Sequence, residues 1–316
     1  MLQWTRRAGL AAMLLAGAML TGCWDEDSGP DNIVETAKDN PELSLLVEAV
    51  AAADLTATLS GPGPLTVFAP TNGAFTALLA ELGLTKDQLF ADKPLLTAVL
   101  TYHVLGAEVE AGDIDLGSPI EPLAGGYFKV DTSSGSLAAT DGRNRISRIT
   151  DTDVEASNGV IHIVDKVLLP ADKTVVGTAV ALSEADPPEF TLLVEALQTT
   201  GLDATLNGTG PFTVFAPTDA AFAALLEELG LTKDELFADT ALLTNVLTYH
   251  VVPALVLQAD VPVGPAITTV QGGTFTVNAS LQITDANARV AQITATDVLA
   301  GNGVIHVIDK VILPTL

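Results

Sequence analysis

The sequence is poor in cysteine, aromatic residues and positive charge, and each shortage excludes something. Cys23 is the single cysteine among the 316 residues, so no disulfide can form within one chain. Aromatic residues make up 5% of the chain and hydrophobic residues 48%, so a core must be built mainly from Leu, Val, Ile and Ala. The formal net charge is −25, from 14 Lys and Arg against 39 Asp and Glu. Such a charge argues against binding to nucleic acid or bare anionic lipid and is typical of a solvated, soluble surface.

The first 22 residues have the pattern of an export signal. Arg6 and Arg7 give a positive start, and Ala8 to Leu20 form an apolar run too short to span a bilayer comfortably. Leu20-Thr21-Gly22-Cys23 then resembles the bacterial lipobox, whose cysteine is diacylated and becomes the new N-terminus. We therefore expect residues 1–22 to be a lipoprotein signal peptide and Cys23 to be the lipidation site that anchors the protein in a membrane. An ordinary secretory signal with a chance cysteine is the alternative.

Residues 23–31 are acidic and rich in turn-forming residues, which is typical of a short tether. No second apolar run of membrane length follows in the sequence, so we expect the remainder to lie outside the bilayer. Together with the lipobox, this pattern predicts an exported protein that is lipid-anchored in the bacterial cell envelope, on the periplasmic face or the cell surface.

An internal repeat is the strongest signal in the sequence. Four segments recur at an offset of 147 residues and a fifth recurs at 144: Leu45–Ala49 as Leu192–Ala196, Thr66–Thr71 as Thr213–Thr218, Leu84–Asp87 as Leu231–Asp234, Leu100–Val104 as Leu247–Val251, and Asn158–His162 as Asn302–His306. The difference of three residues falls between Asp131 and Asp141, in a stretch that predicts a loop tip. The period is far longer than a solenoid unit. We therefore expect two complete domains, over residues 32–171 and 172–316.

Each repeat begins with helical periodicity and ends with strand-like segments. One helical face of the first repeat is formed by Leu45, Leu46, Ala49, Val50 and Ala53. Leu65–Ala69 predicts a short strand ended by Pro70, after which Thr71 or Asn72 is placed to cap a helix. Val160–Leu169 predicts a final strand. Helices first and strands later indicate an α+β domain.

These segments resemble the conserved boxes of the fasciclin-domain family. The first box is matched by Thr66–Asn72 and the second by Asn158–Asp165, with the pair Tyr102-His103 between them. The second repeat matches all three, with Asp219 in place of Asn72. The resemblance covers essentially all of residues 32–315 and implies two fasciclin-like domains, each a β wedge with packed helices. It also implies an extracellular adhesion or interaction role, with no catalysis general to the family.

The resemblance marks a candidate partner-binding segment, because integrin binding by animal members is attached to the region around the Tyr-His pair. In this chain the segment is Tyr102, His103, Tyr249 and His250. No Arg-Gly-Asp sequence accompanies it. The alternative is a structural role, in which the pair pins the end of a helix to the sheet through side-chain hydrogen bonds.

The four histidines occupy repeated positions: His103, His162, His250 and His306. A metal site would take two of them with Asp165 or Asp309 in each domain. The spacing favours core histidines instead, because His103 lies on the apolar face of a helix and His162 alternates with valines along a strand. We therefore expect hydrogen-bonded core histidines, with no metal and no cofactor.

The sequence offers no nucleophile, acid–base pair or phosphate loop, so we expect the protein not to be an enzyme. The leading hypothesis is a membrane-anchored extracytoplasmic adhesion or protein-interaction module, whose partner is a protein or a cell-surface or matrix component. The alternative is an envelope protein that binds a small ligand or carbohydrate in a concave pocket. A non-acidic patch exposed at equivalent positions of both repeats would favour the first hypothesis.

Overall fold

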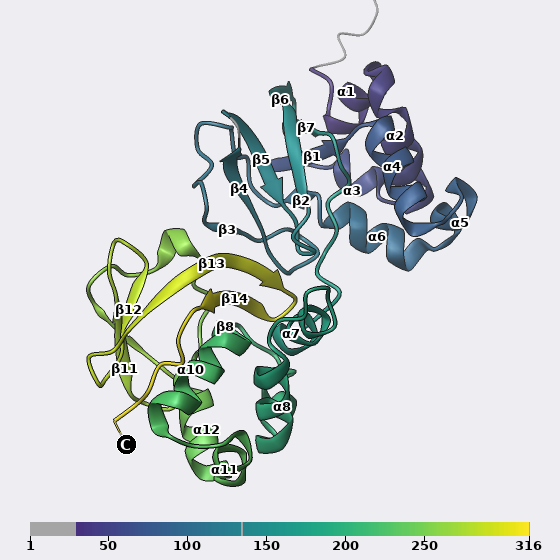
Figure 1. Cartoon of the computed structure of the whole chain (residues 1–316). Helices are drawn as coiled ribbons and strands as arrows, with labels where there is room; N and C mark the ends of the chain where they lie inside the picture. The colour runs from purple at the N-terminus through teal and green to yellow at the C-terminus, as the bar shows by residue number, and fades with distance from the viewer. Residues whose placement is uncertain (1–29, 134, 316) are drawn as a thin grey trace, which may run out of the picture. The chain divides into compact units, whose positions relative to one another are not determined.

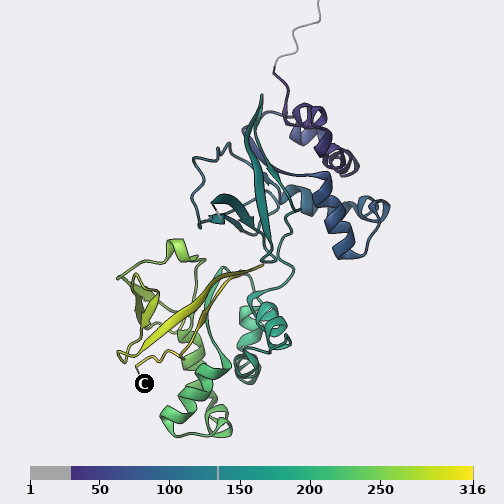
Figure 2. The same cartoon turned by 45° about the horizontal axis from the view of Figure 1, so that its top comes forward.

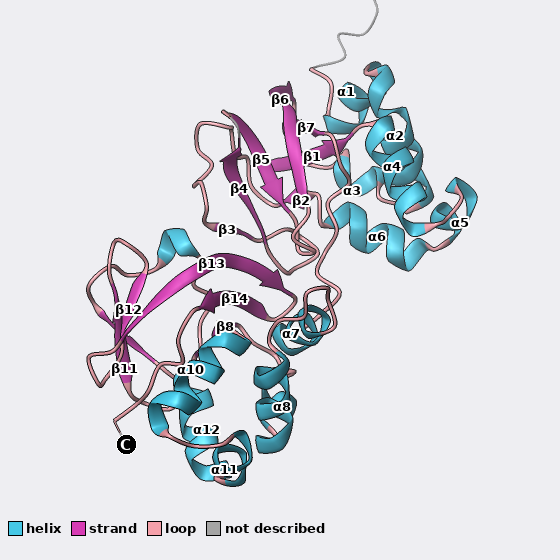
Figure 3. Cartoon of the chain, viewed as in Figure 1, coloured by secondary structure: helices cyan, strands magenta, loops and turns pink. Residues whose placement is uncertain are grey.

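Two seven-stranded sheets follow one another along the chain, each with its own layer of helices (Figure 1). The computed structural model describes residues 30–133 and 135–315. Within each domain the α-helices gather on one side of the sheet (Figure 3), and the turned view shows the same separation (Figure 2), while the 3₁₀ turn at Gln258–Asp260 lies apart from them. The predicted α+β class is confirmed.

The first domain forms six helices and seven strands within the described residues. Its helices are α1 (Ile33–Asp39), α2 (Ser44–Ala52), α3 (Thr56–Leu59), α4 (Asn72–Leu82), α5 (Lys86–Ala91) and α6 (Lys93–Thr101), with a short 3₁₀ turn at Pro41–Leu43. Its strands are β1 (Leu65–Pro70), β2 (Val104–Leu105), β3 (Pro119–Ile120), β4 (Phe128–Ser133), β5 (Ser136–Thr140), β6 (Ile146–Ala156) and β7 (Gly159–Val164).

The second domain repeats this order. Its helices are α7 (Val175–Ser183), α8 (Thr191–Thr200), α9 (Leu202–Leu206), α10 (Asp219–Leu229), α11 (Lys233–Ala238) and α12 (Thr240–Tyr249), with a 3₁₀ turn at Gln258–Asp260. Its strands are β8 (Phe212–Pro217), β9 (Val251–Val252), β10 (Ala266–Thr268), β11 (Thr274–Val277), β12 (Gln282–Thr284), β13 (Val290–Ala300) and β14 (Gly303–Ile308).

The strand order is the same in both sheets: β2-β1-β7-β6-β5-β4-β3 in the first domain and β9-β8-β14-β13-β12-β11-β10 in the second. The interior strands β1 and β7 are parallel, with Leu65 opposite Gly159 and Pro70 opposite Val164. All six residues of β7 are buried. Burial on both faces explains why β7 is apolar at successive positions, with His162 as its one polar residue, rather than alternating.

Each domain holds two large apolar clusters, one on either side of the parallel strands, and the second domain has a further small one at Leu257, Leu299 and Val304. One cluster joins the helices to the sheet and includes Phe75. The other lies within the outer strands, where the Phe68 and Phe128 rings meet edge to face with centroids 5.1 Å apart. Phe215 and Phe275 repeat this contact at 5.0 Å in the second domain. The sheet is therefore the shared middle layer between two small cores.

Local sequence sets the ends of the helix that follows the first strand. The Thr71 side chain accepts a hydrogen bond from the Ala74 N–H at 3.2 Å, so Thr71 is the residue that caps α4. Gly83 adopts a left-handed conformation, with φ of 64°, and ends the helix. Thr218 and Gly230 do the same for α10.

The predicted final strand is wrong at its C-terminal end, because β7 stops at Val164 rather than continuing to Leu169. The chain leaves the sheet at Asp165 and the exposed Lys166, and Val167, Leu168 and Leu169 are buried again. The Leu168 N–H donates to His103 Nε2 at 2.8 Å, and the Leu169 N–H donates to Asp141 Oδ2 at 2.9 Å. Side chains distant in sequence thus replace a neighbouring strand as partners of this backbone.

The three-residue difference between the repeats lies in the hairpin of β4 and β5, within the interval predicted from the offsets. The counterpart hairpin, β11 and β12, has shorter strands. The difference therefore changes the length of one hairpin and leaves the strand order unaltered.

Candidate functional site

The Tyr-His pair lies at the C-terminal end of α6 and is buried, with Tyr102 0% and His103 1% exposed. Two hydrogen bonds fix the His103 ring. Its Nδ1–H donates to the Val99 carbonyl at 2.7 Å, and its Nε2 accepts from the Leu168 N–H at 2.8 Å. His103 therefore ties the last turn of α6 to the extended segment after β7.

Burial lowers the pKa of both helix-end histidines to about 4, for His103 and for His250. Each ring is consequently neutral at neutral pH. The proton sits on Nδ1, because this atom faces a carbonyl while Nε2 faces an N–H. A neutral ring with both nitrogens engaged has no free position for a metal ion or a proton transfer.

Tyr102 joins the same helix end to the outer strands. Its Oη donates to the Tyr127 carbonyl at 2.5 Å, and its ring meets Phe128 with centroids 5.8 Å apart. Burial raises the pKa of Tyr102 above its ordinary value, and the charge of Asp141 acts in the same direction. The hydroxyl therefore stays protonated as a hydrogen-bond donor.

The second domain repeats these contacts. Tyr249 Oη donates to the Thr274 carbonyl at 2.6 Å. His250 Nδ1–H donates to the Val246 carbonyl at 2.8 Å, and its Nε2 accepts from the Ile312 N–H at 3.1 Å. In both domains the pair acts as a buried link between helix and sheet, so a partner would meet the residues that cover the pair.

The strand histidines are also held inside the domains. His162 Nε2 donates to the Val109 carbonyl at 2.9 Å, and its Nδ1 accepts from the Asp153 N–H at 3.3 Å. His306 has the equivalent partners. The prediction of hydrogen-bonded core histidines is confirmed. Within residues 30–133 and 135–315, no three His, Cys, Asp or Glu side chains are grouped so as to hold a metal ion.

Leu123 lies beside the residues that directly follow the Tyr-His pair. Its N–H donates to the carbonyl of Val104, the residue after His103, at 2.8 Å. Its side chain lies over Gly106, where a Cβ would be 3.3 Å from Leu123 Cδ2, yet Leu123 remains 52% exposed. Val270 has the same position in the second domain, with its N–H donating to the Val251 carbonyl at 2.8 Å and an exposed fraction of 47%.

Exposed large apolar side chains recur at equivalent positions of the two repeats. Of seven such residues in the described part of the chain, six form three pairs: Leu116 with Val263, Leu123 with Val270, and Ile146 with Val290. The residue types differ within each pair, but all remain apolar. Single exposed apolar residues are ordinary on protein surfaces, whereas the same three positions used twice in an acidic chain favour a contact surface.

Sequence reasoning missed these positions. The motifs that recur at offsets of 147 and 144 residues are mostly buried. Applied to the turn-rich segments between the motifs, the same offsets would have aligned the three pairs. Their exposure, however, depends on the fold and could not be read from the alignment.

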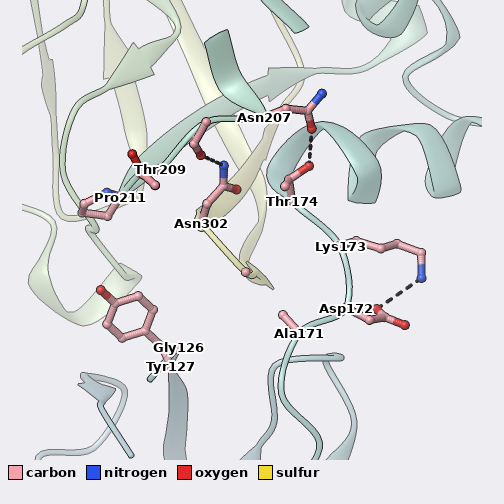
Figure 4. Close-up of a pocket in the computed structure, with 13 residues that line it drawn as sticks. Gly126, Tyr127, Ala171, Asp172, Lys173, Thr174, Asn207, Thr209, Pro211 and Asn302 are labelled. Atoms are coloured by element: carbon pink, nitrogen blue, oxygen red, sulfur yellow. Dashed lines mark hydrogen bonds and ion pairs between the residues drawn. The ribbon is translucent and has the colours of Figure 1, made fainter. Parts of the chain in front are cut away.

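An open pocket of about 540 Å³ lies where the connection between the repeats meets the second domain (Figure 4). The ring of Tyr127 lines it. Its amide side chains are already engaged, because Asn302 Nδ2 donates to the Leu206 and Gly208 carbonyls and Thr174 Oγ1 donates to Asn207 Oδ1. The pocket therefore offers the Tyr127 ring together with the half-exposed ion pair of Asp172 and Lys173.

Cys23, the predicted lipidation site, lies outside the described residues. Across residues 30–133 and 135–315, no helix combines the length and the apolar character needed to cross a membrane.

Comparison with known proteins gives a consistent result. The family model described as "Fasciclin domain" matches residues 41–170 and again residues 188–314. Protein sll1483 of Synechocystis sp. is 43% identical over 141 residues, which cover 44% of this chain and 73% of that protein. Transforming growth factor-beta-induced protein ig-h3 of Sus scrofa is 28% identical over 258 residues, which cover 81% of this chain and 35% of that protein.

A third relative carries a name that bears on location. Cell surface glycolipoprotein MPB83 of Mycobacterium bovis is 33% identical over 145 residues, which cover 44% of this chain and 61% of that protein. The match to ig-h3 spans about a third of that protein's length, so only the domains, and not the whole protein, are compared. The predicted pair of family domains is confirmed.

Proposed function

The chain belongs to the fasciclin-domain family, and from this premise we propose that it is a non-catalytic adhesion or protein-interaction module held outside the cytoplasm. The observation that carries the proposal is the recurrence of exposed apolar residues, above all Leu123 and Val270, which lie beside the short strand that follows the Tyr-His pair of each domain. The partner is a protein or a cell-surface or matrix component. Each domain offers it an apolar contact next to the segment that the family resemblance singled out.

Two copies of one contact raise the strength of attachment to a repeated partner. When one domain is bound, the second meets its partner at a high effective concentration, so overall binding exceeds that of either domain. This holds only if both domains can engage at once. A densely displayed surface or matrix component meets that condition.

The anchor in this proposal is a diacylated Cys23. Its support is the lipobox-like Leu20-Thr21-Gly22-Cys23 and the printed description of MPB83 as a cell surface glycolipoprotein. Radiolabelled palmitate fed to the producing cells is expected to label the wild-type protein and not the Cys23→Ala variant. Equal labelling of the wild type and the variant, or no labelling of the wild type, contradicts the lipid anchor. Either result leaves the proposed binding role unaffected.

The adhesive role is tested by removing the recurrent apolar contacts. Leu123→Ser and Val270→Ser are each expected to weaken adhesion of producing cells or binding to a matrix-coated surface, and the double variant to remove most of it. Both residues are about half exposed, so the stability of the fold should change little. Leu229→Ser is the matched control, because Leu229 is 38% exposed but its counterpart Leu82 is not among the exposed apolar residues. Wild-type adhesion by the double variant contradicts the proposal.

A second candidate function is binding of a small ligand or carbohydrate, which the open pocket favours. Its volume of about 540 Å³ is in the range of ligand sites, and the Tyr127 ring offers a face on which a sugar could stack. Binding of a glycan panel to residues 31–316, lost in Tyr127→Ala, would support this function. Binding that Tyr127→Ala leaves unchanged would exclude this pocket.

A further inference from the structure

Within the compact unit Asp31–Leu316, a buried ion pair joins the two repeats. Lys129 Nζ lies 2.7 Å from Asp297 Oδ2 of the second domain and 2.9 Å from Asp131 Oδ2 of its own domain. The side chain of Lys129 is 13% exposed and that of Asp297 is 3% exposed. Burial alone would lower the pKa of Lys129, but the hydrogen bonds and charges of the two aspartates raise it, so the amino group stays charged.

Asn144 makes a second contact, with the backbone of β13. Its Nδ2 donates to the Leu299 carbonyl at 3.0 Å, and its Oδ1 accepts from the Leu299 N–H at 2.7 Å. One amide side chain thus satisfies both polar groups of a single residue at the edge of a strand. We call Lys129 and Asn144 the donor face, and Asp297 with the Leu299 backbone the acceptor edge.

The repeat shows that the donor face exists only in the first domain. Phe128-Lys129-Val130 corresponds to Phe275-Thr276-Val277, and Asp141–Arg145 corresponds to Asp285–Arg289, so Thr276 and Ala288 stand where the first domain has Lys129 and Asn144. The backbone is the same, with φ of 61° at Asn144 and 59° at Ala288. The second domain therefore lacks the side chains of a donor face but keeps its geometry.

The acceptor edge, in contrast, exists in both domains. Asp153 is the counterpart of Asp297, and both are left-handed residues at an irregularity of the long strand, with φ of 56° and 60°. Each accepts a backbone N–H at 2.7 Å, from Ala111 or from Gln258. Asp153 and Asp297 therefore differ only in their contacts to the other repeat.

In the first domain this edge is free. β5 pairs with β6 only at Ile146–Arg148, so the rest of that edge has no neighbouring strand. The Asp153 side chain is 41% exposed, and Glu155, the counterpart of buried Leu299, is exposed as well. Among the described residues, no lysine or arginine pairs with Asp153. The free acceptor edge, Asp153 with the Glu155 backbone, is thus acidic and lacks the cation that its counterpart receives.

We propose that the free acceptor edge is a docking surface for another fasciclin domain that carries lysine and asparagine at the positions of Lys129 and Asn144. Three observations fit this partner. Asp153 carries a negative charge, and the strand edge beside it is open. The equivalent edge of the second domain is already occupied by the donor face of the same chain. Contact between donor face and acceptor edge is head to tail, so it would extend from copy to copy if both ends were complementary. Thr276 and Ala288 stop that extension in this chain.

The test builds the missing partner from the chain itself. Thr276→Lys with Ala288→Asn supplies a donor face to the second domain, and asparagine tolerates the left-handed backbone at position 288. Adding Asp153→Asn removes this variant's own acceptor, so it cannot join to itself. Mixed with wild-type residues 31–316, the triple variant is expected to form a 1:1 complex in analytical ultracentrifugation, with affinity that falls as salt increases.

Controls separate the docking surface from general association. The same triple variant is expected not to bind the Asp153→Asn chain, while Thr276→Lys with Ala288→Asn alone should form longer head-to-tail oligomers. Circular dichroism and the thermal midpoint of each variant verify folding. A folded triple variant that stays monomeric with the wild type, or that binds the Asp153→Asn chain equally well, overturns the proposal.

Discussion

Single polar side chains hold distant segments together in each domain. Asn158, from the second conserved box, accepts a hydrogen bond from the Ile33 N–H at 2.9 Å and donates to the Leu59 and Gly61 carbonyls at 2.9 and 2.7 Å. Asn302 makes the same three bonds in the second domain. The motif that identifies the family therefore joins the start of α1, the end of α3 and the loop between β6 and β7.

Asn158→Ala is expected to lower the free energy of unfolding by about 2–4 kcal/mol, because it leaves three backbone groups without partners. Asn158→Asp keeps the acceptor for Ile33 but turns a carboxylate oxygen toward the Leu59 and Gly61 carbonyl oxygens, so it should cost at least as much as alanine. Urea unfolding followed by circular dichroism measures both. A cost for Asn158→Asp well below that of Asn158→Ala would contradict the assignment of Nδ2 to the two carbonyls.

The buried histidines predict a dependence of stability on pH. The folded-state pKa of His103 is about 4, below the value of about 6.5 in an unfolded chain. Between these values the unfolded chain binds a proton that the folded chain does not, so stability is complete above pH 6.5 and falls as the pH drops toward 4.

His103→Gln should flatten this decline. The difference in unfolding free energy between wild type and variant is expected to shrink by about 3 kcal/mol from pH 7 to pH 4, the amount that corresponds to the pKa shift. Urea titrations across this range measure it. Parallel curves for the two proteins would mean that His103 does not control the decline.

At the scale of elements, the parallel strands β1 and β7 can pair only because their backbones come very close together at one glycine. Gly159 begins β7 with φ of 149°, and a Cβ at this position would lie 1.8 Å from the Leu65 carbonyl oxygen of β1. Gly303 has the same relation to Phe212 in the second domain, at 2.0 Å. In the Asn-Gly sequence of the second box, Asn158 thus makes the hydrogen bonds that join distant segments, and Gly159 leaves the space that the strand pair needs.

Gly159→Ala is expected to prevent stable folding of the first domain, because the strand pair must separate to admit the methyl group. Gly112→Ala is the matched control, since a Cβ there meets nothing within 4 Å. Protease resistance and the thermal midpoint report the outcome. A Gly159→Ala protein as stable as the control would show that the strands need not lie so close.

The helical periodicity and the short apolar runs of the sequence predicted the helices and strands well. The helical period placed His103 on a buried face, and the apolar runs located β1 and the start of β7. The end of β7 could not be predicted, because the backbone of Leu168 is satisfied by His103, 65 residues earlier. The exposed pairs such as Leu123 and Val270 escaped prediction for a related reason: their exposure depends on which segments the fold leaves uncovered.

At the scale of the whole molecule, the two equivalent contact sites that we propose predict a density-dependent attachment. On a surface densely coated with partner, the wild-type protein should dissociate ten- to a hundredfold more slowly than Val270→Ser, because rebinding of the second domain is lost in the variant. On a sparse surface the two rates should converge. Surface plasmon resonance at several coating densities measures this, and a ratio independent of density would mean that the domains bind singly.

The position of β7 in its sheet has a consequence for how the protein folds. The last strand of the first domain is an interior strand of its sheet, and Leu65 of β1 pairs with Gly159, 94 positions later, so the sheet cannot be completed before β7 is available. Contacts this distant in sequence slow folding, because the loop must close before they form. A chain that emerges N-terminus first can thus make its early helices but not its sheet until almost the whole repeat is available. The same delay follows for β8 and β14, so each domain is completed as its own last strand arrives.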